Sequence, residues 1–279
     1  MMILEAWKNL KWILLIAGAL VVGGWGSYKL YFAPRAMVVH LHGRYPVMAN
    51  DAVDSSRYVW HTTRPKTWVA LKKISPHLIN AVLVSEDVRF YTHHGVDWDE
   101  LHNAIREHFK EGRRWRGAST ITQQLAKNLF LGPQKTLGRK IEELILTWHL
   151  EHQFSKDQIL EYYLNVVEFG ERIYGIAAAG QFYFQKRPSQ LQAREAAFLA
   201  MLLPSPKRHA QSFYQHELTA YAKKIMEQIL FRMAKFKLLK LRDLSMALHS
   251  SFTWENPTFA TWPLGGEELE QKTDELDPM

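Results

Sequence analysis

The sequence contains no cysteine among its 279 residues. Disulfide bonds, thiolate nucleophiles and cysteine-ligated metal sites are therefore excluded by composition. Internal repeats are also missing. Hydrophobic residues make up 47% and charged residues 23% of the chain, which is the balance of an ordinary globular protein. The length suits one main domain with a small appendage and is short of two large catalytic domains.

Acidic residues are in the minority, and the formal net charge is +7. Many of them lie near the C-terminus, where residues 266–279 contain Lys272 as the one basic residue. The rest of the chain is therefore more basic than the total suggests. Such a charge suits an anionic partner such as phospholipid headgroups, pyrophosphate or nucleic acid. No nucleic-acid-binding motif accompanies it, so we expect no nucleic-acid partner.

One long apolar run lies near the N-terminus, from Trp12 to Phe32, and Lys29 is its one charged residue. The run predicts a transmembrane helix at 12–32. Positive charge flanks both of its ends, so the run itself decides little about orientation. A cleaved signal peptide is the alternative. The run ends in Tyr-Lys-Leu-Tyr-Phe, which offers no small-residue cleavage site, so the sequence favours a retained anchor.

The chain after the anchor changes from strand-like to helical patterning. Residues 33–75 contain short alternating stretches, at Met37–Leu41 and Tyr58–Trp60, which predict a strand-bearing connector. Strand signals are absent after residue 75. Helix-start signals then recur at Ser75-Pro76, Asp97 with Glu100, Ser119, Ser155 with Gln158, and Ser189 with Gln192.

The expected organisation beyond the connector has three parts. A main domain covers residues 76–212. A basic C-terminal segment covers 213–250, with one long amphipathic helix from about 215 to 249, which suits a membrane surface or a solvated face over a core. The remaining residues, 251–279, are expected to form a flexible acidic tail.

Glu86 continues the apolar stripe of Leu78 and Val82 at helical spacing, so a carboxylate stands where its neighbours are buried. Partial desolvation raises the pKa of such a group and makes it usable as a general base near neutral pH. The alternative is a carboxylate at a helix end that meets solvent or a backbone amide. His93 follows closely in EDVRFYTHHG, and taken alone it is typical of a hydrogen-bonded structural histidine.

The segment GASTITQQLAKN, from Gly117 to Asn128, has a small-residue turn before a predicted helix. Free backbone amides at such a helix start favour anions. Thr120, Gln124 and Lys127 share one face of that helix, which suits a phosphate site. The alternative is an ordinary amphipathic helix.

Arg139 and Glu143 are four residues apart on a predicted helix that is apolar on nearly every side. Charged residues on a buried helix differ from ordinary solvent-exposed charges, so they suggest a functional role. The alternative is a structural ion pair between the two.

Five segments resemble, in order and spacing, the signature segments of the family 51 glycosyltransferases. They are EDVRFYTHHG, GASTITQQLAKN, RKIEE (139–143), KDQILEYYLN (156–165) and EAAFLAMLLPSP (195–206). This family comprises the polymerising domains of class A penicillin-binding proteins and the monofunctional peptidoglycan glycosyltransferases. The resemblance spans about residues 66–210. Gln185 departs from the pattern, because a glycine commonly precedes the lysine there.

The resemblance implies a mainly α fold, a lysozyme-like helical head with a small membrane-embedded jaw subdomain, preceded by one N-terminal transmembrane helix. It also implies an enzyme of the bacterial inner membrane, with its head on the periplasmic face and residues 1–11 in the cytoplasm. The reaction would polymerise lipid II into β-1,4-linked glycan strands with inversion and release polyprenyl pyrophosphate. No Ser-x-x-Lys motif follows the five segments, so no transpeptidase is expected. The implied partners are lipid II, the growing strand, membrane lipids and other cell-wall synthesis proteins.

The resemblance also implies residue roles. Glu86 would be the base and Glu143 the second catalytic carboxylate. The substrate-binding residues would be Asp87, Phe90, His93, Thr120, Gln124, Lys127, Asn128, Arg139 and Lys140, of which the three cations would hold the pyrophosphate. No cofactor is certain, and a divalent cation, Mg²⁺ or Mn²⁺, is a candidate at the pyrophosphate beside Glu143. Two other functions stay open, a lysozyme-like peptidoglycan-cleaving enzyme and an inactive membrane scaffold.

Overall fold

The computed structural model describes residues 23, 24, 26, 28, 33–49, 58–111, 119–132, 134 and 136–255. Most of these residues are helical, so the predicted mainly α fold is confirmed. Residues 1–11, most of the predicted anchor at 12–32 and most of the predicted tail lie outside the described residues. Within the described ranges, no helix combines the length and the apolar composition that crossing a membrane requires.

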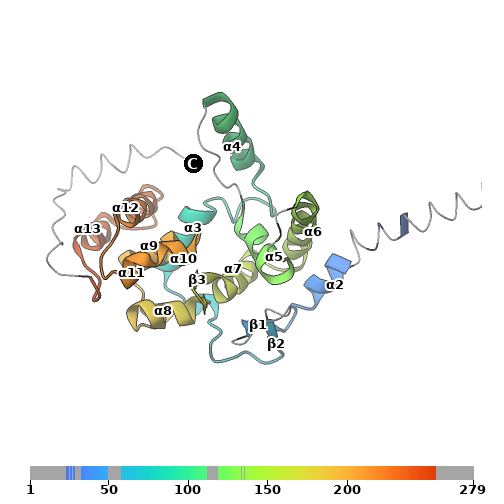
Figure 1. Cartoon of the computed structure of the whole chain (residues 1–279), viewed down its shortest axis with the longest axis horizontal. Helices are drawn as coiled ribbons and strands as arrows, with labels where there is room; N and C mark the ends of the chain where they lie inside the picture. Colours follow the sequence, from blue (N-terminus) through green and yellow to red (C-terminus); the bar gives the residue numbers. More distant parts are fainter. Residues whose placement is uncertain are drawn as a thin grey trace, which may run out of the picture.

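The elements follow the chain as labelled in Figure 1. The longer helices are α3 (Pro76–Glu86), α4 (Trp98–Glu111), α5 (Ile121–Phe130), α6 (Leu137–Gln153), α7 (Lys156–Val166), α9 (Ala193–Leu202) and α12 (Ala220–Lys235). The shorter ones are α2 (Ala33–Val39), α8 (Ile176–Phe184), α10 (Pro206–His209), α11 (Gln211–Tyr214), α13 (Leu241–His249) and the 3-10 helices η2 (Leu71–Lys73) and η3 (Pro188–Gln190). Two antiparallel hairpins pair β1 (Tyr45–Met48) with β2 (Tyr58–His61) and β3 (Glu168–Gly170) with β4 (Ile173–Tyr174).

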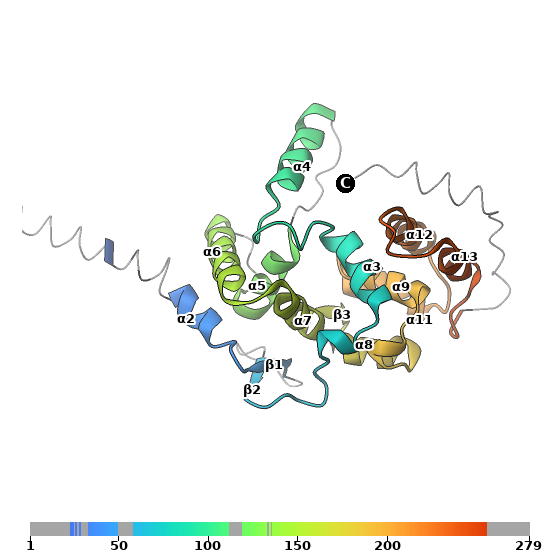
Figure 2. The ribbon, with the colours of Figure 1, turned by 180° about the vertical axis from the view of Figure 1, so that it is seen from behind.

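Two groups of helices lie on either side of α7 (Figures 1 and 2). In one group α3 packs on α9, and α12 contacts both, while α13 lies against α9 and α12. In the other group α5 packs between α6 and α7, and α2 lies on α6. Helix α4 stands away from both groups in the two views. The head therefore has one packed body and one projecting helix.

Helix α9 forms the centre of the first group. All its residues except Glu195 are buried, because apart from Arg194 and Glu195 its sequence is apolar on every side. Its extensive contact with α3 fixes the direction of that helix. Glu86 is the last residue of α3, so the packing of α9 determines where this carboxylate stands.

The predicted helix starts are confirmed at Ser75, Asp97 and Ser155. The prediction at Ser119 is wrong by one residue, because Thr120 caps α5. The Thr120 side chain accepts a hydrogen bond from the Gln123 backbone amide, and the Gln123 side chain accepts one from the Thr120 amide. This reciprocal pair requires a spacing that Ser119 does not have.

The prediction at Ser189 is also wrong. Ser189 lies inside η3, and α9 begins after Gln192. The side chain of Glu195 accepts a hydrogen bond from the Gln192 backbone amide, 2.9 Å away. The helix start is therefore set three residues later than the serine suggests.

The connector is only partly as predicted. Tyr58–Trp60 lies in β2, whereas Met37–Leu41 forms the end of α2 and a turn instead of a strand. The hairpin β3–β4 was not expected, and it is too short to leave a periodic signal. It leads into α8 at Gly175, whose φ of +78° favours glycine and where a Cβ would lie 2.5 Å from the Asn165 carbonyl oxygen.

The single long helix predicted from about 215 to 249 is wrong. Helix α12 ends at Lys235 and α13 begins at Leu241. Lys237, between them, has a φ of 59°, which a continuous helix does not allow. The break lets α13 fold back onto α9 and α12, and it buries Leu244, Ala247 and Leu248.

A short segment after α13 closes over the end of α9. The Arg194 guanidinium donates to Glu255 over 2.9 Å and stands 4.6 Å from the centre of the Phe252 ring. The rings of Phe252 and Trp254 stack with centres 4.6 Å apart. Residues up to Glu255 therefore belong to the packed head.

Candidate active site

Glu86 lies at the C-terminal end of α3 and faces α5. Its Oε2 accepts a hydrogen bond from Gln124 Nε2 over 2.8 Å. Burial raises the pKa of Glu86 above the usual 4.5, and the hydrogen bond from Gln124 and the positive charge of Lys127 oppose that rise. The sequence predicts this partial desolvation, and the structure places the carboxylate half-buried. Such a carboxylate can accept a proton near neutral pH.

Asp87 ties the end of α3 to the start of α5. Its Oδ1 lies 2.9 Å from His93 Nε2, and its Oδ2 accepts from the Ile121 backbone amide over 3.0 Å. A carboxylate is favoured at this helix start, where backbone amides are free. At the start of α5, the Ile121 amide is therefore occupied by Asp87 of the chain itself. Among the described residues, His93 Nδ1 is buried and has no hydrogen-bond partner.

Phe90 and Thr120 are buried next to the contact between the end of α3 and the start of α5. Phe90 is fully buried, and the Lys156 ammonium stands 4.5 Å from its ring centre. The Thr120 hydroxyl donates to the Gly95 carbonyl over 2.6 Å. Both side chains are buried, so they fix the shape of the site and have little surface to offer a substrate.

Three cations from α5 and α6 gather around the buried carboxylate of Glu143. They are Lys127, Arg139 and Lys140. Glu143 forms an ion pair with Lys140, whereas the alternative left open by the sequence was an ion pair with Arg139. Lys140 is three residues before Glu143 and Arg139 four, and both spacings bring side chains together on a helix. Arg139 Nε is buried without a hydrogen-bond partner in the described part of the chain.

The charge balance of this group is positive. Lys127 is exposed, yet the protein around it removes part of its water and lowers its pKa, Glu143 raises that pKa, and Arg139 and Lys140 lower it further. The cations therefore repel one another, and the carboxylates that oppose this repulsion are Glu143 and, at Lys127, also Glu86. An anionic ligand would relieve this repulsion.

The structure thus brings together Glu86, Gln124 and Lys127 on one side and Glu143 with its cations on the other. Lys127 links the two sets, because both glutamates raise its pKa. Asn128 lies half-buried on α5 beside Lys127. The arrangement places one proton acceptor next to a cationic cluster.

Tyr163 belongs to the site and was missed from the sequence. Its hydroxyl donates to Gln124 Oε1 over 3.0 Å, from a fully buried position on α7. The segment KDQILEYYLN contains Tyr162 and Tyr163 side by side, and spacing alone does not tell which one turns inward. The burial of α7 on both faces removes the usual amphipathic signal.

One group of side chains has the spacing of a metal site. Asp87, His93 and Asp97 bring ligand atoms within 4.8 Å of one another. Arg89 occupies both carboxylate oxygens of Asp97, one of them over 2.9 Å, and Asp87 holds the start of α5. The donors are therefore engaged by the protein, and the group does not fit a resident cation.

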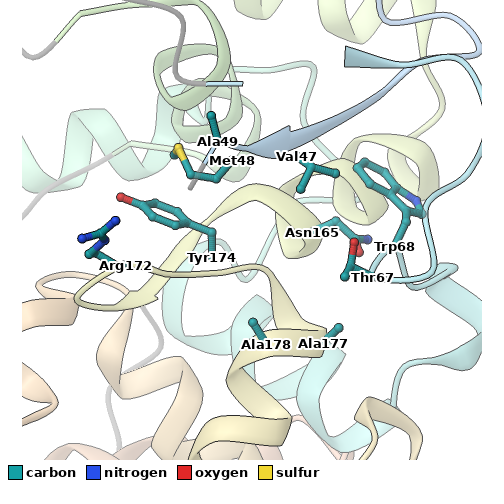
Figure 3. Close-up of a pocket in the computed structure, with 10 residues that line it drawn as sticks. All are labelled: Val47, Met48, Ala49, Thr67, Trp68, Asn165, Arg172, Tyr174, Ala177 and Ala178. Carbon is teal, nitrogen blue, oxygen red and sulfur yellow. The ribbon is translucent and has the colours of Figure 1, made fainter. Parts of the chain in front are cut away.

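A cavity of about 290 Å³ lies beside Asn165, near the C-terminal end of α7 (Figure 3). It opens between Val47 to Ala49 of the first hairpin and Ala177 and Ala178 of α8. Asn165 lines it, but the side chain of Asn165 is already hydrogen-bonded to both backbone groups of Val69. None of the predicted site residues lines this cavity.

Comparison with known proteins decides the family. The model of the family described as Transglycosylase matches residues 54–234. The chain belongs to the transglycosylase family. A protein of Aromatoleum aromaticum is 44% identical over 164 residues, which is 59% of this chain and 71% of the relative. A protein of Herminiimonas arsenicoxydans is 44% identical over 172 residues, 61% of this chain and 72% of the relative.

A third relative, from Rhodospirillum centenum, is 50% identical over 143 residues, covering 51% of this chain and 62% of the relative. All three are called biosynthetic peptidoglycan transglycosylases. The matched segment of this transglycosylase includes every predicted site residue and ends inside α12. The resemblance drawn from the five sequence segments is confirmed, and α13 lies beyond the match.

Proposed function

We propose that this transglycosylase is a cell-envelope enzyme that polymerises the lipid-linked disaccharide of peptidoglycan, lipid II, into β-1,4-linked strands. The names of its relatives support the peptidoglycan substrate class. The observation that carries the proposal is the half-buried carboxylate of Glu86 beside the cationic group of Lys127, Arg139 and Lys140. A glycosyl transfer from a pyrophosphate donor needs one base and one cationic clamp.

In the proposed step, the 4-hydroxyl oxygen of the incoming lipid-linked disaccharide attacks the anomeric carbon of the growing strand. Glu86 accepts the hydroxyl proton as the new carbon–oxygen bond forms. The bond from the anomeric carbon to the pyrophosphate breaks on the opposite face, so the configuration inverts. The electron pair leaves with the polyprenyl pyrophosphate, and Lys127, Arg139 and Lys140 offset its charge.

A divalent cation at the pyrophosphate is part of the proposal only as a companion of the substrate. Glu143 is engaged by Lys140, and the surrounding cations disfavour a resident metal ion. A pyrophosphate that enters this group would bring its own negative charge. Mg²⁺ or Mn²⁺ would then be held by the pyrophosphate, with Glu143 as the protein ligand.

A lysozyme-like hydrolase is less well supported by this site. Cleavage of a glycan requires two carboxylates, one as acid and one as base or nucleophile, on either side of the sugar. Here the second carboxylate, Glu143, is buried in an ion pair with Lys140. Supplying purified protein with preformed glycan strands and, separately, with lipid II tests the choice. We expect turnover of lipid II alone, and shortening of the strands would favour the hydrolase.

Two helices offer an apolar surface for a membrane. On α4, Trp98 and Phe109 are 68% and 77% exposed, and on α6 Leu137 is 87% exposed. Trp98, Ile105 and Phe109 lie on one face of α4, the helix that stands away from the body in Figure 2. Exposed apolar side chains of this kind are typical of interfacial helices. We propose that this surface is the membrane-embedded jaw.

A probe at position 109 tests the jaw directly. Because the chain has no cysteine, a spin label on Phe109→Cys is the one labelled site. In vesicles we expect the label about 5–10 Å below the headgroup boundary, as for an interfacial helix. A label on Tyr221→Cys, an exposed aromatic on α12, is the matched control and should stay in water. Equal depths at both positions would contradict the proposed jaw.

The orientation across the membrane is a separate prediction. The proposed substrate is polymerised outside the cytoplasm, so the head bearing Glu86 should face that side, with an anchor at 12–32. Ser251 is exposed and lies far from the site residues in the chain. Ser251→Cys in intact spheroplasts should react with a membrane-impermeant thiol reagent. Labelling that occurs only after lysis would place the head in the cytoplasm.

A further inference from the structure

The amide of Gln124 has two different ends, and only one end suits a charged Glu86. A carboxylate accepts hydrogen bonds and cannot donate them. The N–H end must therefore face Glu86, and the structure places Nε2 2.8 Å from Glu86 Oε2. The carbonyl end then needs a donor on its other side. That donor is the Tyr163 hydroxyl, 3.0 Å from Gln124 Oε1.

Tyr163 is suited to act as a permanent donor. Burial, with smaller contributions from the charges of Glu86 and Asp87, raises the pKa of Tyr163 well above its usual value. The phenol therefore keeps its proton near neutral pH. Its ring is fully buried on α7, so it holds one position relative to α5.

We propose that Tyr163 is a positioning residue that locks the Gln124 amide with its N–H end toward Glu86, and so keeps Glu86 ready to accept a proton. The inference deepens the proposed function, because it assumes that Glu86 is the base. With the amide turned over, Oε1 would face the carboxylate, and only a protonated Glu86 would be compatible with it. Without the Tyr163 hydroxyl, no hydrogen bond from α7 favours one orientation of the Gln124 amide over the other.

Other charged groups around Glu86 do not replace this lock. Lys127 of α5 lowers the pKa of Glu86, and Asp87 next to it raises that pKa. Arg232 of α12 reaches the Val84 carbonyl over 3.5 Å. None of these contacts the carbonyl end of Gln124. At the N–H end, the Ser119 carbonyl is a second and longer acceptor, 3.5 Å from Nε2.

Two tyrosine variants distinguish the effect of orienting the Gln124 amide from the effect of losing any buried hydroxyl. Tyr163→Phe removes the donor to Gln124. Tyr162→Phe removes a neighbouring buried hydroxyl that donates to the Leu41 carbonyl, 2.7 Å away and outside the contact with Gln124. The full chain is labelled with ¹³C at glutamate carboxyls, and Glu86→Gln assigns the Glu86 signal. We expect the titration midpoint of Glu86 to move to higher pH in Tyr163→Phe and to stay in place in Tyr162→Phe.

The rate of lipid II polymerisation against pH gives a second readout. In Tyr163→Phe, kcat/KM should fall about tenfold on the acidic limb and return near the wild-type value at high pH, as expected for one hydrogen bond to a charged group. A Glu86 midpoint that is equal in both variants, or a loss of rate by the same factor at every pH, would overturn the lock. If the wild type does not polymerise lipid II, the proposed function fails, while the carboxyl titration still decides the inference.

Discussion

Replacing Glu86 with glutamine is expected to lower the rate of lipid II polymerisation by at least about 10²-fold, the usual effect of losing a general base. Glutamine has nearly the shape of glutamate and can still contact Gln124, but it cannot take the hydroxyl proton. Initial rates of the two proteins, measured at equal helicity, provide the test. More than about a tenth of the wild-type rate in Glu86→Gln would contradict the assignment of the base.

Although Glu86→Gln should lose activity, its folding stability should be equal to or higher than that of the wild type. Because burial raises the pKa of Glu86, the folded protein binds this proton more tightly than the unfolded chain does. The charged form is thus disfavoured in the fold at neutral pH, and folding stability contributed by this group falls as pH rises through the raised pKa. Glu86→Gln should have an equal or higher Tm. The wild-type rate should in turn fall as pH drops through that same pKa.

Replacing Lys127 with alanine is expected to lower kcat/KM by about 10²-fold, the loss typical of removing one group that offsets charge in the transition state. The charge of Lys127 interacts with both Glu86 and Glu143, and its side chain is exposed to an incoming ligand. Since partial loss of water and the neighbouring cations Arg139 and Lys140 oppose its charge, Lys127→Ala should leave Tm nearly unchanged. Rates with lipid II and thermal melts of the same samples measure both effects.

Lys224→Ala, an exposed lysine on α12, is the matched control for Lys127→Ala. It removes the same charge from the surface of the head and should keep the wild-type rate. A large drop in Tm for Lys127→Ala with normal specific activity in the folded fraction would mean that Lys127 is structural. An equal loss of rate in both variants would mean that only the overall charge matters.

Much of the site follows from local pattern and from the resemblance. Glu86 is predicted by its place on an apolar stripe, and α5 by its cap and polar face. These features depend on residues close together in sequence, which is where helical periodicity carries information. The capping residue of α5 is wrong by one position, because Ser119 and Thr120 are chemically alike and only the reciprocal bond with Gln123 distinguishes them.

Features that depend on distant contacts could not be predicted. The pairing of Arg194 with Glu255 joins residues 61 positions apart, and the helix break at Lys237 lets α13 fold back onto α9. The choice of Tyr163 over Tyr162 likewise depends on which side of α7 faces α5. Glu143 has cations at both three and four residues before it, and side-chain direction decides in favour of Lys140.

The most direct test of the account is the reaction of the purified full-length chain with lipid II in vesicles, followed by analysis of both products. We expect β-1,4-linked strands and one polyprenyl pyrophosphate released for each disaccharide added, and neither product with Glu86→Gln. Lipid II that stays unconverted by the wild type, or strands formed equally by Glu86→Gln, would contradict the proposed polymerase.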